Sequence, residues 1–125
     1  MPVTYNPAED PWLAPDKAQH FAFCFACTAA GYLLARRSSS LREHRLAIGA
    51  AVGVAAGVLK EVGDVLQWWP GALSIRDLGA DGVGVAVALA VLVAAEARQR
   101  RPSAAAAAAR MQQPPQKQQL AEGMV

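Results

Sequence analysis

The chain has 125 residues, of which 54% are hydrophobic and only 6% aromatic, and its formal net charge at pH 7 is +2. This length allows one domain, and a composition rich in Ala, Val, Leu and Gly indicates an all-α protein and not a β-sandwich or barrel. A nucleic-acid-binding surface is excluded, because the net charge is small and the basic residues lie in the connections between apolar stretches.

Residues 1–15 are expected to form an exposed leader. Four prolines in this segment remove backbone donors and disfavour helix in the residues before them. The segment matches neither a signal peptide nor a transit peptide, because it combines acidic residues with prolines and has no early apolar run.

Three helices are predicted after the leader, over about residues 16–37, 41–69 and 74–97. The Pro70-Gly71 pair is a strong signal for the end of the second helix. Ser74 and Asp77 match the start of a capping box, in which the Ser74 hydroxyl caps free amides and the Asp77 carboxylate lies near the positive end of the helix dipole.

These helices have the properties of membrane spans. Uncharged runs such as 46–59 are shorter than the roughly 20 residues that a bilayer span needs, but with their flanks the helices reach that length. The runs are also apolar on all faces, which a soluble bundle would not tolerate. We therefore expect a small integral membrane bundle of three antiparallel helices over residues 16–97.

Arginines predict the orientation of this bundle. They are concentrated in the first loop, at 36–45, and directly after the third helix, at 98–101. The positive-inside rule places the N-terminus outside and the C-terminus in the cytoplasm or its organellar equivalent. The remaining residues, 98–125, are rich in Gln and Pro and predict a largely disordered polar tail in which the alanine tract is able to form helix.

Glycines mark the packing faces of the predicted helices. Gly49, Gly53 and Gly57 recur every four residues and form one small-residue stripe, and Gly84 lies on a similar face of the third helix. Such a stripe packs against other helices of the same chain or against a second copy. The two neighbouring helices favour packing within the chain.

Nearly all ionisable residues of the apolar region fall at the outer end of this bundle, where the first helix starts, the second ends and the third starts. The predicted polar cluster consists of Asp16, Lys17, His20, Lys60, Glu61, Asp64, Arg76, Asp77 and Asp81. A charge inside a bilayer is unfavourable unless it has a partner, so these groups are expected to face one another.

Two interpretations of the cluster lead to different functions. In the first, its charges neutralise one another and fix the helix register, which favours a structural or accessory membrane protein that is not an enzyme. In the second, an excess of carboxylates beside one imidazole binds a ligand. That ligand is either a divalent cation or a phosphorylated or cationic membrane-associated substrate, on which the chain would act as an enzyme or a binding protein. The candidate cation ligands are His20, Glu61, Asp64 and Asp81.

A proton or ion pathway is a third alternative. Zinc hydrolysis is disfavoured, because the second histidine, His44, falls in the arginine-rich loop at the opposite end. The sequence identifies no catalytic residue. The expected partners are the lipid bilayer and either a second copy of the chain or another membrane protein.

Three motifs in order resemble a known family. DKAQHF at 16–21, KEVGD at 60–64 and SIRDLGADGVG at 74–84 are similar to the DKxxHF, KExxD and SxxDxxxDxxG motifs of the YfiM-type small bacterial lipoproteins, with a weaker similarity to VanZ-like membrane proteins. The resemblance implies a shared site without a firmly assigned activity. By this resemblance, the residues of the shared site would be Asp16, Lys17, His20, Lys60, Glu61, Asp64, Asp77 and Asp81. The chain shows no lipobox cysteine near its start, so we expect its own helices to hold it in the bilayer.

Overall fold

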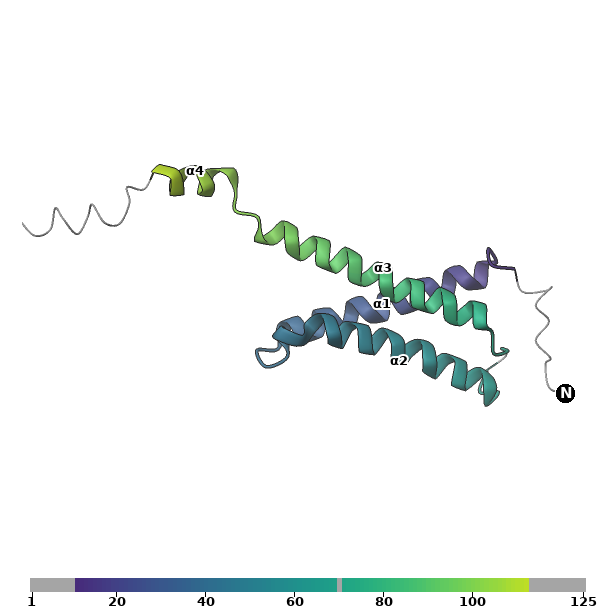
Figure 1. Ribbon diagram of the computed structural model, residues 1–125. Helices are drawn as coiled ribbons and strands as arrows, with labels where there is room; N and C mark the ends of the chain where they lie inside the picture. Colours follow the sequence, from purple (N-terminus) through teal and green to yellow (C-terminus); the bar gives the residue numbers. More distant parts are fainter. Residues whose placement is uncertain (1–10, 70, 113–125) are drawn as a thin grey trace, which may run out of the picture. The chain divides into compact units, whose positions relative to one another are not determined.

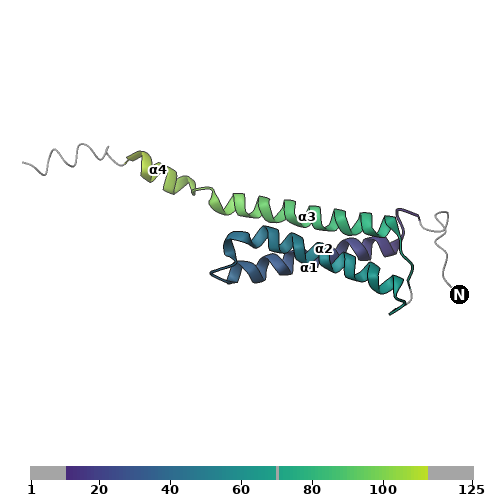
Figure 2. The same ribbon diagram turned by 60° about the horizontal axis from the view of Figure 1, so that its bottom comes forward.

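The computed structural model describes residues 11–69 and 71–112, and all of its regular structure in these ranges is helical. The elements are α1 (Pro15–Arg37), the 3-10 helix η1 (Arg42–His44), α2 (Arg45–Val65), α3 (Ile75–Arg100) and α4 (Ala104–Gln112). α1, α2 and α3 run in alternating directions (Figures 1 and 2), which confirms the predicted all-α architecture of three packed helices. The first ten residues of the predicted leader and residues 113–125 of the predicted tail lie outside the described residues.

The chain divides into two compact units between Val93 and Ala94. The first contains α1, α2 and most of α3. The described part of the second contains the last turns of α3 and the helix α4, which is formed by the alanine tract and has no buried residue.

The first unit has an unusual distribution of side chains. Its buried hydrophobic residues are few and mostly small, including Cys24, Ala35 and Ala88, whereas its buried polar residues include Lys17 and His20. Large aliphatic side chains of all three helices are exposed. α1, α2 together with η1, and α3 are each long and apolar enough to cross a membrane. Polar groups inside and aliphatic groups outside are what a bilayer favours.

Glycines let the helix backbones approach closely. Gly49 lies against the Thr28 carbonyl of α1, where an added Cβ would be 2.9 Å from the oxygen. A Cβ at Gly57 would lie 3.1 Å from Asp81 Oδ2 on α3, and one at Gly84 would overlap the Phe21 carbonyl of α1. The glycine stripe therefore lies against helices of the same chain.

The second helix is shorter at both ends than the sequence predicts. It ends at Val65, not Trp69, because Gln67 adopts a left-handed conformation with φ 57°. The N–H of Trp68 donates to the Gly63 carbonyl at 3.0 Å and the N–H of Gln67 to the Asp64 carbonyl at 3.2 Å, which together form a Schellman motif. Its start is also later, at Arg45, since the preceding residues form η1.

Candidate functional site

The start of α1, the end of α2 and the start of α3 bring the predicted polar residues together. Six of them are buried: Lys17, His20, Glu61, Asp64, Asp77 and Asp81. Lys60 is half-buried and Asp16 is exposed. Arg76 is half-buried, and its guanidinium carbon lies 5.6 Å from the centroid of the Trp12 ring. The sequence-based prediction of a buried Asp/His/Lys cluster is therefore confirmed.

Two lysines neutralise part of this cluster. Lys17 Nζ lies 2.5 Å from Asp77 Oδ1 and 2.7 Å from Asp16 Oδ2, so it joins α1 to α3. Lys60 Nζ lies 2.8 Å from Asp64 Oδ2, one turn further along α2. These pairs are the mutual neutralisation expected of charges in an apolar bundle.

Asp64 has a second partner that the sequence did not indicate. The indole Nε1 of Trp69 donates to Asp64 Oδ1 at 2.6 Å, while Lys60 holds the other oxygen. Gly63 makes room for this contact, because a Cβ there would overlap the Trp69 ring. Both oxygens of Asp64 are thus engaged at 2.8 and 2.6 Å. These contacts are closer than those of Glu61, whose Oε1 lies 3.4 Å from Lys60 Nζ and whose Oε2 lies 3.3 Å from the Ser74 backbone nitrogen.

The capping box predicted at the start of α3 is only half formed. Ser74 Oγ accepts the Asp77 N–H at 3.3 Å, as expected. The Ser74 N–H, however, donates to Glu61 Oε2 at 3.3 Å and not to the Asp77 carboxylate. Glu61 of α2 therefore substitutes for the acid that a capping box takes from the third helical residue. The Asp77 carboxylate does not bind the Ser74 N–H and instead pairs with Lys17 of α1.

His20 lies between two carboxylates. Its Nδ1 is 3.0 Å from Asp81 Oδ1, and its Nε2 is 3.4 Å from Asp77 Oδ2. The contact with Asp81 is a hydrogen bond, whereas the contact with Asp77 is a longer approach of a ring nitrogen to a carboxylate oxygen. His20 therefore lies where α1 meets two carboxylates of α3.

One set of possible metal ligands converges at this point. Ligand atoms of His20, Glu61 and Asp81, all buried, lie within 4.8 Å of one another. Six ligands around a Mg²⁺, Mn²⁺ or Ca²⁺ ion are about 3 Å apart when adjacent and up to about 4.8 Å apart when opposite. The three residues therefore have the spacing of ligands to a single ion.

Asp81 supplies a further sign of incomplete pairing. Its Oδ2 is buried and has no hydrogen-bond partner among the residues that the structure describes. The atom faces α2 where Gly57 leaves space, and the buried Cys24 thiol lies beside the same carboxylate. A buried carboxylate oxygen without a partner is destabilising, which makes this atom an available ligand.

The charges of the buried groups are also unbalanced. In the described part of the chain, Glu61, Asp64, Asp77 and Asp81 are buried carboxylates. The lysines that contact them are Lys17 and Lys60. The buried carboxylates therefore outnumber the lysines that pair with them, and His20 lies beside two of these carboxylates.

Comparisons with models of known protein families, with curated proteins and with solved structures find no match. The similarity to YfiM-type lipoproteins therefore stays a prediction from three motifs. The function has to be inferred from the geometry of the cluster.

Proposed function

We propose that this chain is an integral membrane protein whose buried cluster binds one divalent cation through His20, Glu61 and Asp81. The observation that carries the proposal is Asp81 Oδ2, a buried carboxylate oxygen without a hydrogen-bond partner among the described residues, in a group whose ligand atoms lie within 4.8 Å of one another. A cation there would satisfy this oxygen and balance the excess of buried carboxylates over lysines.

In this proposal the cluster has two parts with different roles. The pairs formed by Lys17 with Asp77 and by Lys60 with Asp64 hold the helices in register, which is the structural role that the sequence favoured. The group formed by His20, Glu61 and Asp81 holds the cation. An ion pathway is less well supported, because Thr28, Tyr32 and the other buried side chains further along the described bundle include no carboxylate or imidazole.

The ligand set suits a hard cation. Two carboxylates and one imidazole match Mn²⁺ or Mg²⁺ better than Zn²⁺, whose structural and catalytic sites use more nitrogen and sulfur. Three protein ligands leave open coordination positions on a six-coordinate ion.

The proposed orientation places this cation site near the outer surface of the membrane. Trp12 and Trp68, both largely exposed, are at the end of the chain's helices that carries the cluster, where amphipathic rings favour the membrane interface. The arginine-rich loop at 36–45 is at the other end of α1 and α2. This distribution supports an N-terminus outside.

Titration of the purified, detergent-solubilised chain with Mn²⁺, followed by electron paramagnetic resonance, tests the proposal. We expect one bound ion per chain and a release of protons on binding, because the ligands must be deprotonated. Glu61→Gln and Asp81→Asn should each lower the affinity at least about tenfold. Glu43→Gln removes an exposed carboxylate at the opposite end of the helices and should leave the affinity unchanged.

Circular dichroism of each variant keeps the experiment interpretable. If the two ligand variants retain their helix content and still bind Mn²⁺ as the unmodified chain does, the cation site is wrong. An unmodified chain that binds no Mn²⁺ would equally rule it out, and the cluster would then serve only to hold the helices.

A further inference from the structure

A short basic loop, residues 36–45, joins α1 to α2 at the end of these helices opposite the cluster (Figure 1). Its basic residues are Arg36, Arg37, Arg42 and Arg45. Glu43 is its single acid, so four positive charges against one negative charge leave a net charge of +3 when His44 is neutral. The first three arginines are exposed, and η1 has no buried residue. The basic loop therefore presents its positive charge on the surface.

The helices on either side hold the basic loop at the membrane surface. In the described chain, one candidate membrane span ends at Arg37 and the next begins at Arg42, so residues 38–41 alone connect them. Leu33 and Leu34, exposed by 50% and 67%, lie about one turn before the end of α1, and such side chains favour the hydrocarbon core. Three residues of helix rise about 4.5 Å, and the headgroup layer on each side of a bilayer is roughly 5–7 Å thick. In a bilayer the arginines therefore lie at the level of the lipid phosphates.

The chemistry of the basic loop suits a phosphate. A guanidinium group donates two parallel N–H bonds to phosphate oxygens, and four or more basic residues directly beside a membrane span are typical of sites for anionic lipids. Arg45 Nη1 donates to the Arg42 carbonyl at 2.6 Å, which fixes η1 against the first turn of α2. Among the described residues, His44 is the N-cap of α2, and its side chain forms no capping hydrogen bond. The positive end of the α2 dipole therefore adds to the attraction of the arginines for an anion.

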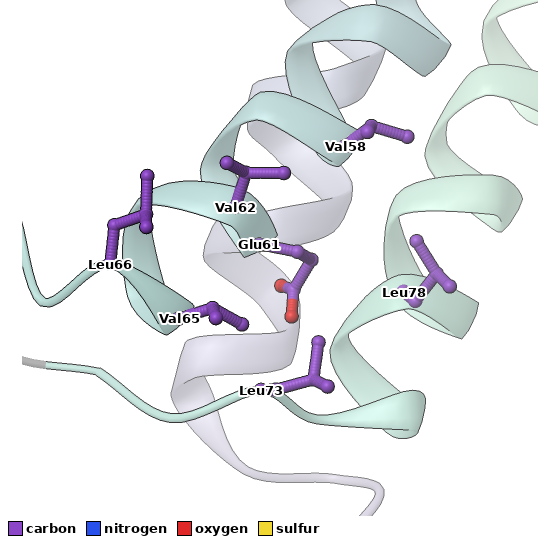
Figure 3. A pocket seen from close by; sticks show the side chains of 7 residues that line it. All are labelled: Val58, Glu61, Val62, Val65, Leu66, Leu73 and Leu78. Carbon is purple, nitrogen blue, oxygen red and sulfur yellow. The ribbon is translucent and has the colours of Figure 1, made fainter.

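The groove at the other end of α2 offers no such attraction. This groove, shown in Figure 3, is lined by aliphatic side chains of α2, α3 and the segment between them, and by Glu61. The residues that line it include no lysine or arginine. Lipid contacts in the groove would not favour a negative headgroup over a neutral one.

We propose that the basic loop binds the phosphate groups of anionic phospholipids through Arg36, Arg37 and Arg42. This interaction goes beyond the proposed cation binding and does not depend on it, because the basic loop and the cluster lie at opposite ends of α1 and α2. Anionic lipid that binds only the folded chain would also stabilise the pair of helices that the loop connects.

Native mass spectrometry of the detergent-solubilised full chain, with equal amounts of dioleoyl phosphatidylglycerol and dioleoyl phosphatidylcholine, tests this inference. The two lipids share their hydrocarbon chains, so a difference in retention reports the headgroup. We expect the chain to retain at least about tenfold more phosphatidylglycerol. Arg42→Gln removes an exposed charge of the basic loop and should lower the affinity for phosphatidylglycerol about fivefold. Arg110→Gln removes the same charge from an exposed position of α4 and should change this affinity less than about twofold.

Four results would overturn the lipid site. Equal retention of the two lipids would show that the chain does not recognise headgroup charge. Equal losses in Arg42→Gln and Arg110→Gln would reduce the preference to attraction by net charge. Inorganic phosphate that competes as well as phosphatidylglycerol does would make free phosphate the ligand. The preference should also persist in EDTA, and its loss there would place the headgroup at the proposed cation site and not at the basic loop.

Discussion

A single buried carboxylate shows how this bundle stabilises its charges. Asp64 is 1% exposed, and its two oxygens are held by an ammonium group from its own helix and by an indole N–H from the segment after it. The spacing along the sequence is sufficient for the first partner, because Lys60 and Asp64 are one helical turn apart. It could not predict the second, since Trp69 reaches Asp64 only when the helix ends early and the chain folds back.

The contact between Trp69 and Asp64 predicts a difference between two adjacent tryptophans. Trp69→Phe keeps an aromatic ring but removes the N–H donor, so a buried carboxylate oxygen loses its partner at a cost of about 1–3 kcal/mol. Trp68→Phe, at a position that is 64% exposed, should change stability little. Thermal unfolding in detergent, followed by circular dichroism, should show a lower midpoint for Trp69→Phe alone. Equal midpoints for the two variants would contradict the Asp64 hydrogen bond.

The proposed ligand set was only partly accessible from the sequence. The antiparallel arrangement predicted that His20, Glu61, Asp64 and Asp81 would share one end of the bundle. Which of them retain free oxygens depends on contacts from other elements. Lys60 and Trp69 engage both oxygens of Asp64, whereas Asp81 Oδ2 has no hydrogen-bond partner among the described residues, and no local pattern encodes that difference.

At the scale of elements, glycine spacing determines how closely the helices approach. The stripe on α2 lies against α1 and α3, and Gly84 of α3 lies against the Phe21 carbonyl of α1. Spacing by four residues predicted these faces, because it depends only on helix geometry. The end of α2 was predicted wrongly, since the residue in the left-handed position is Gln67 and not the glycine that usually marks it.

Two glycines of α3 provide a matched test of this packing. An alanine at residue 84 would overlap a backbone carbonyl, so Gly84→Ala should force the helices apart and destabilise the bundle by about 1–3 kcal/mol. Gly82 has nothing within 4 Å of an added Cβ, so Gly82→Ala should stabilise the helix by up to about 1 kcal/mol. Unfolding midpoints of the two variants in detergent should move in opposite directions. If both rise, α1 and α3 do not pack as described.

At the scale of the whole molecule, the arrangement of polarity was the most predictable feature. Long apolar runs without a polar stripe already indicated that the outer faces of the helices meet lipid. The structure agrees, because aliphatic residues such as Leu34, Leu59 and Val83 are exposed while the charges of the cluster are buried. Orientation in the membrane cannot be read from this arrangement, because turning the bundle over leaves every internal contact unchanged.

The arginines give a testable prediction of that orientation. They gather where α1 leads into α2 and at the end of α3, so both regions should stay on the cytoplasmic side. A fluorescent protein fused to the C-terminus in a bacterial host should fold and fluoresce, and alkaline phosphatase at the same position should be inactive. Replacing Arg36, Arg37, Arg42 and Arg45 by glutamine should raise the phosphatase signal, because the charge difference that holds the first loop inside is then reduced. Replacing the exposed Gln112 by asparagine changes no charge and should leave both signals as they were.

An active phosphatase on the unmodified chain would reverse the orientation and move the cation site to the cytoplasmic face. A chain that remained soluble and monomeric without detergent would rule out the membrane spans themselves.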